Sequence, residues 1–187
     1  FVLGFGDPRC LGWLGRVMAR CQGPEPADAV LTVPCGVPSE TTTALSSRWE
    51  HEVAPRLGEG PCHLAIAPGS HDLLAGISLA RSRLNLANIL DATLGAHLPA
   101  LVVGPPPRTD APEAAQEELS AAFADVCRRR RVPYVETFTP LVRHEQWLTD
   151  LAAGDGIHPG QTGHGLLAWL VLHAGWQSWL GIAETAL

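Results

Sequence analysis

Five short apolar segments alternate along this chain with longer segments of helical periodicity. Each apolar segment is largely continuous rather than interrupted by polar residues, which is typical of parallel strands that are covered on both faces. Four of the five run into Gly or Pro, as strand ends commonly do. The segments are Val2–Phe5, Ala29–Val33, Leu64–Ala67, Ala100–Val103 and Tyr134–Phe138.

The segments that follow these runs predict helices, with candidate caps at Ser39 and Thr41 and a first-turn proline at Pro112. This alternation predicts one doubly wound, three-layer α/β/α sandwich around a parallel sheet of five strands. In such sheets, ligands bind at the carboxyl ends of the strands, near the point where the strand order reverses. The predicted helices are Leu11–Cys21, Ser39–Leu57, Arg81–His97, Pro112–Arg131 and Gly163–Trp179.

Length and charge narrow the possible classes of protein. With 187 residues, 46% of them hydrophobic and 17% charged, the chain is apolar enough for one domain over residues 1–187 and too apolar for disorder. Nucleic-acid binding relies on clustered positive charge, so a net charge of −6 argues against such a partner. The one basic run, Arg128 to Arg131, stands at a predicted helix end, where cations are favoured.

Neither a disulfide scaffold nor a metal site is indicated. The five cysteines are odd in number and irregular in spacing, so we expect mostly buried free thiols in a reducing, cytoplasmic compartment. No HExxH pattern or comparable cluster predicts a metal, and no motif predicts a cofactor. We expect no signal peptide and no membrane span, and the pattern leaves the oligomeric state open.

Asp155 and His158 form the most suggestive polar pair in the sequence. A carboxylate three residues before a histidine in a Gly/Pro turn can accept a hydrogen bond from the imidazole Nδ1–H. That bond fixes the tautomer and leaves Nε2 free to act as a base. Taken alone, an Asx-type turn explains the spacing about as well.

Four loops taken together resemble the sequence blocks of the SGNH hydrolases, also called the GDSL esterase/lipase family. The blocks occur in the family's order and at family-like spacing, so the resemblance covers nearly the whole chain. It implies a flavodoxin-like α/β/α fold with strand order 2-1-3-4-5, and hydrolysis of esters, thioesters or acetylated sugars by a Ser-His-Asp triad. The matching segments are Gly6-Asp7, Gly36-Val37-Pro38-Ser39-Glu40-Thr41, Gly69-Ser70-His71-Asp72, and Asp155-Gly156-Ile157-His158-Pro159 followed by Gly163-His164.

Three positions depart from the family pattern. Pro8 stands where the family has its nucleophilic serine, and it lacks both a hydroxyl and a backbone N–H, so the nucleophile and one oxyanion donor are missing. Ser39 replaces the block-two glycine, but its backbone N–H can still serve as an oxyanion donor. His71 replaces the block-three asparagine, and an imidazole N–H can donate in place of an amide. Asp155 and His158 carry over unchanged.

Several residues are candidates to supply the missing functions. Cys10 lies near the start of the first predicted helix, where a thiol beside a histidine becomes a competent nucleophile, although we expect its side chain to point away from the serine's place. Ser39 and Ser70 are further candidates near the expected pocket, and Arg9 could pair with an acidic ligand or with Asp7. We interpret the remaining histidines as surface or internally satisfied residues: His51, His63, His97, His144, His164 and His173.

Two functions stay open. In the first, the protein acts on a small-molecule or carrier-bound acyl or ester substrate by hydrolysis, acyl transfer or cyclisation. His158, oriented by Asp155, is then the general base, and His71 and the Ser39 N–H stabilise an oxyanion. In the second, the protein is a catalytically inactive SGNH pseudoenzyme that serves as a binding or interaction module. The SGNH-like topology predicts that Pro8, Ser39, His71, Asp155 and His158 converge at the carboxyl edge of the sheet.

Overall fold

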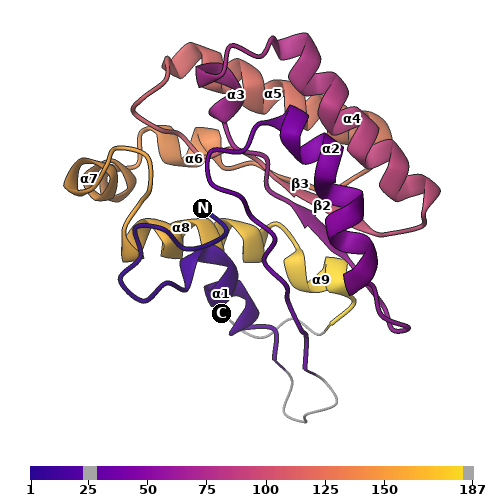
Figure 1. The fold of residues 1–187 in the computed structure, drawn as a ribbon. Coiled ribbons are helices and arrows are strands. Elements are labelled where there is room, and N and C mark those ends of the chain that lie inside the picture. Colours follow the sequence, from indigo (N-terminus) through magenta and orange to yellow (C-terminus); the bar gives the residue numbers. More distant parts are fainter. Residues whose placement is uncertain (23–28, 183–187) are drawn as a thin grey trace. The chain divides into compact units, whose positions relative to one another are not determined.

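Three of the five expected strands form a parallel sheet in the computed structural model, which describes residues 1–22 and 29–182 (Figure 1). Within these ranges the sheet contains β1 (Leu64–Ile66), β2 (Ala100–Val103) and β3 (Tyr134–Val135), in that spatial order. Both pairs are parallel, and the register places Ala65 opposite Leu101 and Val102 opposite Tyr134. These are the third, fourth and fifth expected strands, and their order agrees with that part of the predicted topology.

The expectation of a strand at Val2–Phe5 is wrong. The backbone makes consecutive turns there, because the Gly4 N–H donates to the Phe1 carbonyl and the Asp7 N–H donates to the Gly4 carbonyl, each at 3.0 Å. Gly4 has a φ of +71°, a conformation that glycine adopts easily and a strand does not use. An added Cβ at Gly4 would lie 2.6 Å from the Gly12 nitrogen, so this turn packs directly against the start of the first helix.

The expectation of a strand at Ala29–Val33 is also wrong. Among the described residues this segment pairs with no strand, and most of its apolar side chains are exposed: Leu31 is 90% exposed and Val33 60%. An apolar run favours a strand only when a sheet face buries it. Because its side chains are mostly exposed, burial does not stabilise strand pairing in this segment.

Helices form where their periodicity predicted them, with shifted ends. The last predicted helix is split in two at Gly175, which has a φ of +90°. The confirmed helices are α1 (Gly12–Met18), α2 (Thr42–Val53) with the 3-10 turn η2 (Ala54–Arg56), α4 (Leu79–Gly95), α5 (Glu113–Arg130), and the pair α8 (Gln161–His173) and α9 (Trp176–Leu180). The described part of the chain contains three further helices that were not predicted: α3 (His71–Leu74), α6 (Phe138–Val142) and α7 (Glu145–Ala153).

The chain divides into two compact units. The first comprises Phe1–Gly36 together with Arg143–Leu187, and the second comprises Val37–Val142. The first unit therefore holds α1, α7, α8 and α9, and the second holds the sheet with α2 to α6. Whether the two units fold together as the single predicted domain over residues 1–187 is not shown by this division, so that expectation stays a prediction.

The core of the second unit lies between the sheet and the helices α4 and α5. Leu86, Ile89 and Leu90 follow the helical spacing that puts apolar side chains on one face of α4, and all three are buried. They pack in one cluster with Phe123 of α5 and Val102 of β2. All four residues of β2 are buried, as expected for a strand covered on both faces.

In the first unit, α8 packs along α1 and also contacts α7 and α9 (Figure 1). Val17 of α1 and Leu167 and Val171 of α8 are buried. The Trp13 ring meets the Trp176 ring edge to face, with centroids 6.1 Å apart, which joins α1 to α9. The loop between α7 and α8, which carries Asp155 and His158, is thus anchored at both ends on packed helices.

The cysteines differ from the expectation of mostly buried thiols. All five are described and free, but only Cys21 and Cys127 are buried, so that expectation is wrong.

The basic run lies at a helix end, as predicted. Arg128 and Arg129 lie in the last turn of α5 and pair with Asp125 on the same helix. Across residues 1–22 and 29–182, no helix is both long and apolar enough to cross a membrane, and no group of three or more His, Cys, Asp or Glu side chains is arranged to hold a metal ion.

We expect Leu90→Ala to lower the free energy of unfolding by about 2–5 kcal/mol, because it leaves a cavity in the fully buried face of α4. Leu84→Ala on the same helix is the matched control: Leu84 is 48% exposed, so the loss should be at most about 0.5 kcal/mol. Urea unfolding of both variants measures the difference. Equal losses would show that α4 does not pack as described.

Candidate functional site

The turn that carries Asp155 and His158 is held in place by its own backbone. The N–H groups of Gly154 and Gly156 both donate to the Leu151 carbonyl, at 3.1 Å, where α7 ends. At the other end of the loop, Asp150 of α7 accepts a hydrogen bond from the Gly163 N–H at 2.7 Å, which ties α7 to the first turn of α8. The turn is therefore fixed relative to both helices.

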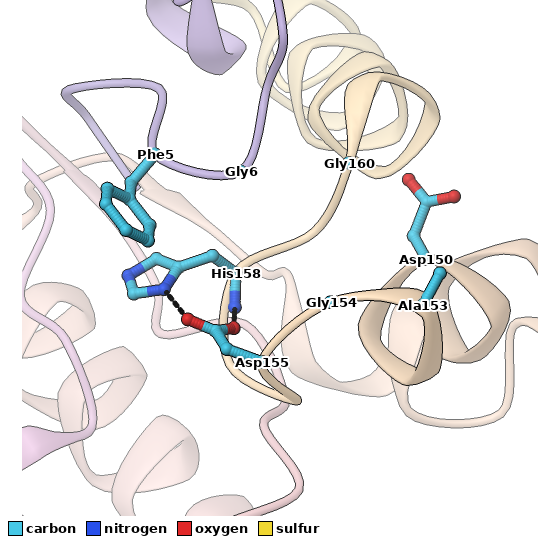
Figure 2. A pocket seen from close by; sticks show the side chains of 8 residues that line it. All are labelled: Phe5, Gly6, Asp150, Ala153, Gly154, Asp155, His158 and Gly160. Carbon is cyan, nitrogen blue, oxygen red and sulfur yellow. Dashed lines mark hydrogen bonds and ion pairs between the residues drawn. The ribbon is translucent and has the colours of Figure 1, made fainter.

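Asp155 accepts three hydrogen bonds from within this turn. The backbone N–H groups of Ile157 and His158 donate to Oδ1 at 2.9 and 2.8 Å, and His158 Nδ1–H donates to Oδ2 at 2.8 Å (Figure 2). Burial opposes ionisation of this carboxyl, but the hydrogen bonds from the His158 ring and from the two backbone N–H groups outweigh it and lower the pKa to about 2. Because the carboxylate can only accept, Nδ1 carries the proton and Nε2 carries a free lone pair. The hydrogen bond that the spacing predicted is present.

The N-terminal loop covers the His158 ring. The Phe5 ring meets the imidazole edge to face with centroids 4.7 Å apart, and the Phe1 ring lies at 5.5 Å. Nε2 points away from Asp155, toward the Phe5 ring (Figure 2). At Gly6, with a φ of +89°, an added Cβ would lie 2.5 Å from the Pro159 carbonyl oxygen and 3.2 Å from the His158 Cβ. Glycine is therefore required where this loop crosses the histidine.

A cavity of about 290 Å³ opens beside this pair, within the first unit (Figure 2). The His158 side chain is 27% exposed, so solvent or a small ligand reaches it. The Asp150 carboxylate points toward Gly160 rather than toward His158 and is engaged by the Gly163 N–H (Figure 2). The cavity is lined by Phe5, Gly6, Asp150, Ala153, Gly154, Asp155, His158 and Gly160.

Asp7 organises the loop that carries Pro8. Its buried carboxylate accepts from the N–H of Arg9 at 3.1 Å and of Gly12 at 3.0 Å, and it forms an ion pair with Arg16. The hydrogen bond from Arg16 outweighs the opposing effect of burial and lowers the pKa of the Asp7 carboxyl. The proposed pairing of Asp7 with the Arg9 side chain is therefore wrong: Arg16, one turn into α1, reaches the carboxylate instead.

Pro8 and Cys10 are both exposed and lie outside the lining of the cavity. Cys10 has a φ of +52°, and its N–H donates to the Asp7 carbonyl at 2.8 Å, so it ends a turn just before α1. Arg9 is exposed as well. The first unit thus brings Asp155 and His158 together, with Phe5 and Gly6, and keeps the side chains of positions 8 to 10 on the surface.

Ser39, Ser70 and His71 belong to the second unit. Ser39 is exposed in a turn with a φ of +55°, the left-handed conformation for which glycine is the usual residue. Ser70 is the N-cap residue of α3, although its side chain makes no capping hydrogen bond, and it is buried at 2% exposure. His71 is the first residue of α3. Ser70 Oγ and His71 Nδ1 are both buried without a hydrogen-bond partner among the described residues.

A buried network fixes the backbone around these residues. Asp72, which is fully buried, accepts from the Thr42 N–H at 2.7 Å and from the hydroxyls of Thr42 and Ser82. Asn85 Nδ2 donates to the Thr42 hydroxyl at 3.0 Å. The start of α2 and the start of α3 are therefore held together, with Ser39 and His71 next to them in sequence. Because these residues and His158 belong to different units, their convergence stays a prediction.

Two residues of the first unit have roles that the sequence did not predict. Phe5 was expected in a strand, and no short pattern marks an aromatic residue as a cover for a histidine. Arg16 lies nine residues after its partner Asp7, beyond any local motif. His164 agrees with the expectation of a surface or internally satisfied histidine, because it is fully buried and Nε2–H donates to the Phe5 carbonyl at 3.0 Å. The sequence did not indicate Phe5 as its partner.

Comparison with known proteins agrees with this architecture. The sequence profile of the GDSL-like lipase/acylhydrolase family matches residues 2–166. The comparison with curated proteins found no significant match.

Solved structures of esterases resemble the chain over most of its length. A lipase/acylhydrolase from Enterococcus faecalis has a TM-score of 0.64 and 22% identity over 80% of this chain and 75% of its own. The acetylxylan esterase Axe2 from Geobacillus stearothermophilus has a TM-score of 0.74 and 16% identity over 94% and 83% of the two chains. The esterase EstA from Pseudoalteromonas sp. has a TM-score of 0.72 and 15% identity over 96% and 93%. The predicted fold, the α/β/α fold of the SGNH hydrolases, is confirmed.

The Asp155 carboxyl should titrate by ¹³C NMR with a midpoint of about pH 2, rather than at its ordinary value of 3.8. Because the folded-state pKa lies below the unfolded value, the stability that Asp155 contributes is present above about pH 4 and is lost as the pH falls toward 2. The difference in stability between the wild type and Asp155→Asn should therefore shrink over that interval. A midpoint near 3.8 would show that the hydrogen bonds to this carboxylate do not persist in solution.

Proposed function

Because the chain belongs to the GDSL-like lipase/acylhydrolase family and has proline in place of the family serine, we propose that it processes acyl or ester substrates with a histidine base and no serine nucleophile. His158, oriented by Asp155, takes a proton from water or from a nucleophile that the substrate itself supplies. The observation that carries the proposal is the 2.8 Å hydrogen bond from His158 Nδ1–H to Asp155, which leaves the Nε2 lone pair free beside a cavity.

Hydrolysis by this site needs no covalent intermediate. Water forms a bond to the acyl carbon as His158 Nε2 accepts its proton, and the carbonyl oxygen becomes an oxyanion. The bond from the acyl carbon to the leaving oxygen or sulfur then breaks, and the imidazolium returns the proton to the leaving group. Asp155 stabilises the imidazolium that forms between these steps. Acyl transfer or cyclisation follows the same sequence when a substrate hydroxyl or amine replaces water.

His71 and the Ser39 N–H are the proposed oxyanion donors. The sequence resemblance assigns them this role, and the local structure of the second unit supports it. His71 stands at the end of the loop after β1, and the Asp72–Thr42 hydrogen bond holds that loop beside the start of α2. Preorganised donors of this kind contribute about 10²–10³ in rate.

We assign the substrate class from the family and the cavity. About 290 Å³ accommodates a small acyl group rather than a bulky polymer. Axe2 is an acetylxylan esterase, and the Pseudoalteromonas structure is of an esterase inhibited by monoethylphosphonate, so proteins of this fold include esterases. The proposed substrate is a small molecule, or an acyl group on a carrier, with no cofactor.

A second candidate is a catalytically inactive binding module. Pro8 favours it, because the residue removes the hydroxyl and one N–H that ordinary esterase chemistry uses. In that case the hydrogen bonds of Asp155 stabilise the turn, and the cavity serves only to bind. The two functions predict different effects of replacing His158: an enzyme loses turnover, whereas a binding module has no turnover to lose.

Replacing His158 by Ala should lower turnover of p-nitrophenyl acetate and S-acetyl-pantetheine by about 10²–10⁴-fold, or to the rate in buffer alone, because the general base is lost. The wild-type rate on these probes should itself be low, since position 8 has no hydroxyl. Asp155→Asn should cost a comparable factor, because it favours the wrong imidazole tautomer.

The matched control for this measurement is His173→Ala, which removes an exposed histidine from α8 and should leave the rate unchanged. Thermal unfolding checks that each variant folds. If His158→Ala and Asp155→Asn are as active and as stable as the wild type, the protein is not an enzyme of the kind proposed, and the binding module is the better interpretation.

Pro8→Ser should not by itself create a conventional esterase site. The change restores a hydroxyl and a backbone N–H to the family's nucleophile position, but Pro8 is exposed and lies outside the lining of the cavity beside His158. We therefore expect Pro8→Ser to turn over p-nitrophenyl acetate no faster than Pro8→Ala, which restores the N–H alone. A gain of about 10²-fold in the serine variant that His158→Ala abolishes would show that position 8 faces the base after all.

A further inference from the structure

The geometry points to His164 as a positioning residue: it holds the Phe5–Gly6 segment against the His158 ring and so sets the orientation of the base. Its consequence for turnover rests on the proposed function. The positioning itself concerns only the structure of the first unit and can be measured without a substrate.

His164 is fully buried in α8, six residues beyond His158. Its Nε2–H donates to the carbonyl of Phe5 at 3.0 Å. A carbonyl can only accept, so the proton must be on Nε2. This side-chain hydrogen bond joins α8 to the N-terminal loop across 159 positions in sequence.

The residue held by this bond is the one that covers the base. The Phe5 ring meets the His158 imidazole edge to face at 4.7 Å, on the side where Nε2 lies (Figure 2). Phe5 is 65% exposed, so burial does little to fix it. The hydrogen bond from His164 holds the Phe5 backbone directly to α8, in addition to the turn hydrogen bonds at Gly4 and Asp7.

Gly6 extends the same contact. Its backbone crosses the His158–Pro159 peptide so closely that a Cβ would lie 2.5 Å from the Pro159 oxygen. If the Phe5 carbonyl lost its donor, this crossing would loosen, and His158 would lose neighbours on the face that Asp155 does not hold. Misplacement of a catalytic group by about 1 Å can lower a rate by about 10²-fold.

The surroundings of His164 keep it neutral. Burial is the main cause that lowers the pKa of its imidazole, and the charge of Arg16 acts in the same direction. The bond to Phe5 and the charge of Asp7 act in the opposite direction, and burial outweighs them. Nδ1 is buried with no hydrogen-bond partner among the described residues. A neutral ring with its proton on Nε2 is the form that donates to Phe5.

The first measurement uses the unmodified protein. Long-range ¹H–¹⁵N NMR spectra report which ring nitrogen of each histidine is protonated. We expect the Nε2–H tautomer for His164 and the Nδ1–H tautomer for His158. An Nδ1–H tautomer at His164 would overturn the inference, because the ring could not then donate to Phe5 through Nε2.

The second measurement compares variants by the ring-proton shifts of His158, which the Phe5 ring current displaces. Phe5→Leu defines the shifts without the ring. His164→Leu should move the signals toward those values, whereas His164→Gln, which keeps an N–H donor of similar reach, should retain the wild-type shifts. His173→Gln, at an exposed position of the same helix, should change nothing. Unchanged shifts in a folded His164→Leu, or displaced shifts in a folded His164→Gln, would refute the positioning role.

Turnover separates this inference from the proposed function. If the wild type hydrolyses p-nitrophenyl acetate no faster than His158→Ala, the proposed function fails, but the NMR comparison still decides the role of His164. If the wild type is active, His164→Leu should lower kcat by up to about 10²-fold with little change in KM, and His164→Gln should restore it. A lowered kcat with unchanged His158 shifts would contradict positioning.

Discussion

Three hydrogen bonds converge on the carboxylate of Asp155, and they determine what the loop between α7 and α8 can do. Two come from the backbone of the turn and one from His158 Nδ1, so the bonds that shape the turn also orient the ring. A carboxylate with a pKa of about 2 is ionised throughout the physiological range. The His158 ring is consequently held in the tautomer that a general base requires, whatever stands at position 8.

A proline at the family's nucleophile position changes the role that we propose for the histidine. In a triad the histidine activates a protein hydroxyl, whereas in the proposed mechanism it activates water or part of the substrate. General-base assistance and oxyanion stabilisation each retain part of their effect without a covalent intermediate, which is why triads without their nucleophile keep some catalysis. Asp7 still organises its loop through Arg16 and Gly12, so the scaffold around Pro8 persists although the reactive group does not.

Local patterns predicted local structure well. The spacing of Asp155 and His158 predicted their hydrogen bond, and continuous apolar runs predicted β1, β2 and β3. The same rule failed at Val2–Phe5, because apolar character does not reveal that Gly4 adopts a positive φ. Contacts between residues far apart in sequence, such as His164 with Phe5, depend on how α8 packs. A periodic pattern of apolar residues does not predict such contacts.

Pre-steady-state kinetics with p-nitrophenyl acetate, combined with intact-mass spectrometry of quenched samples, tests the serine-independent mechanism most directly. A covalent route produces a burst of p-nitrophenol and an acylated protein, which are the fingerprints of nucleophilic catalysis. We predict linear release from the first turnover, dependence on His158 and no acylated protein. A burst close to one equivalent, with the acyl group mapped to Cys10, Ser39 or Ser70, would contradict the mechanism and identify the nucleophile that replaced the serine.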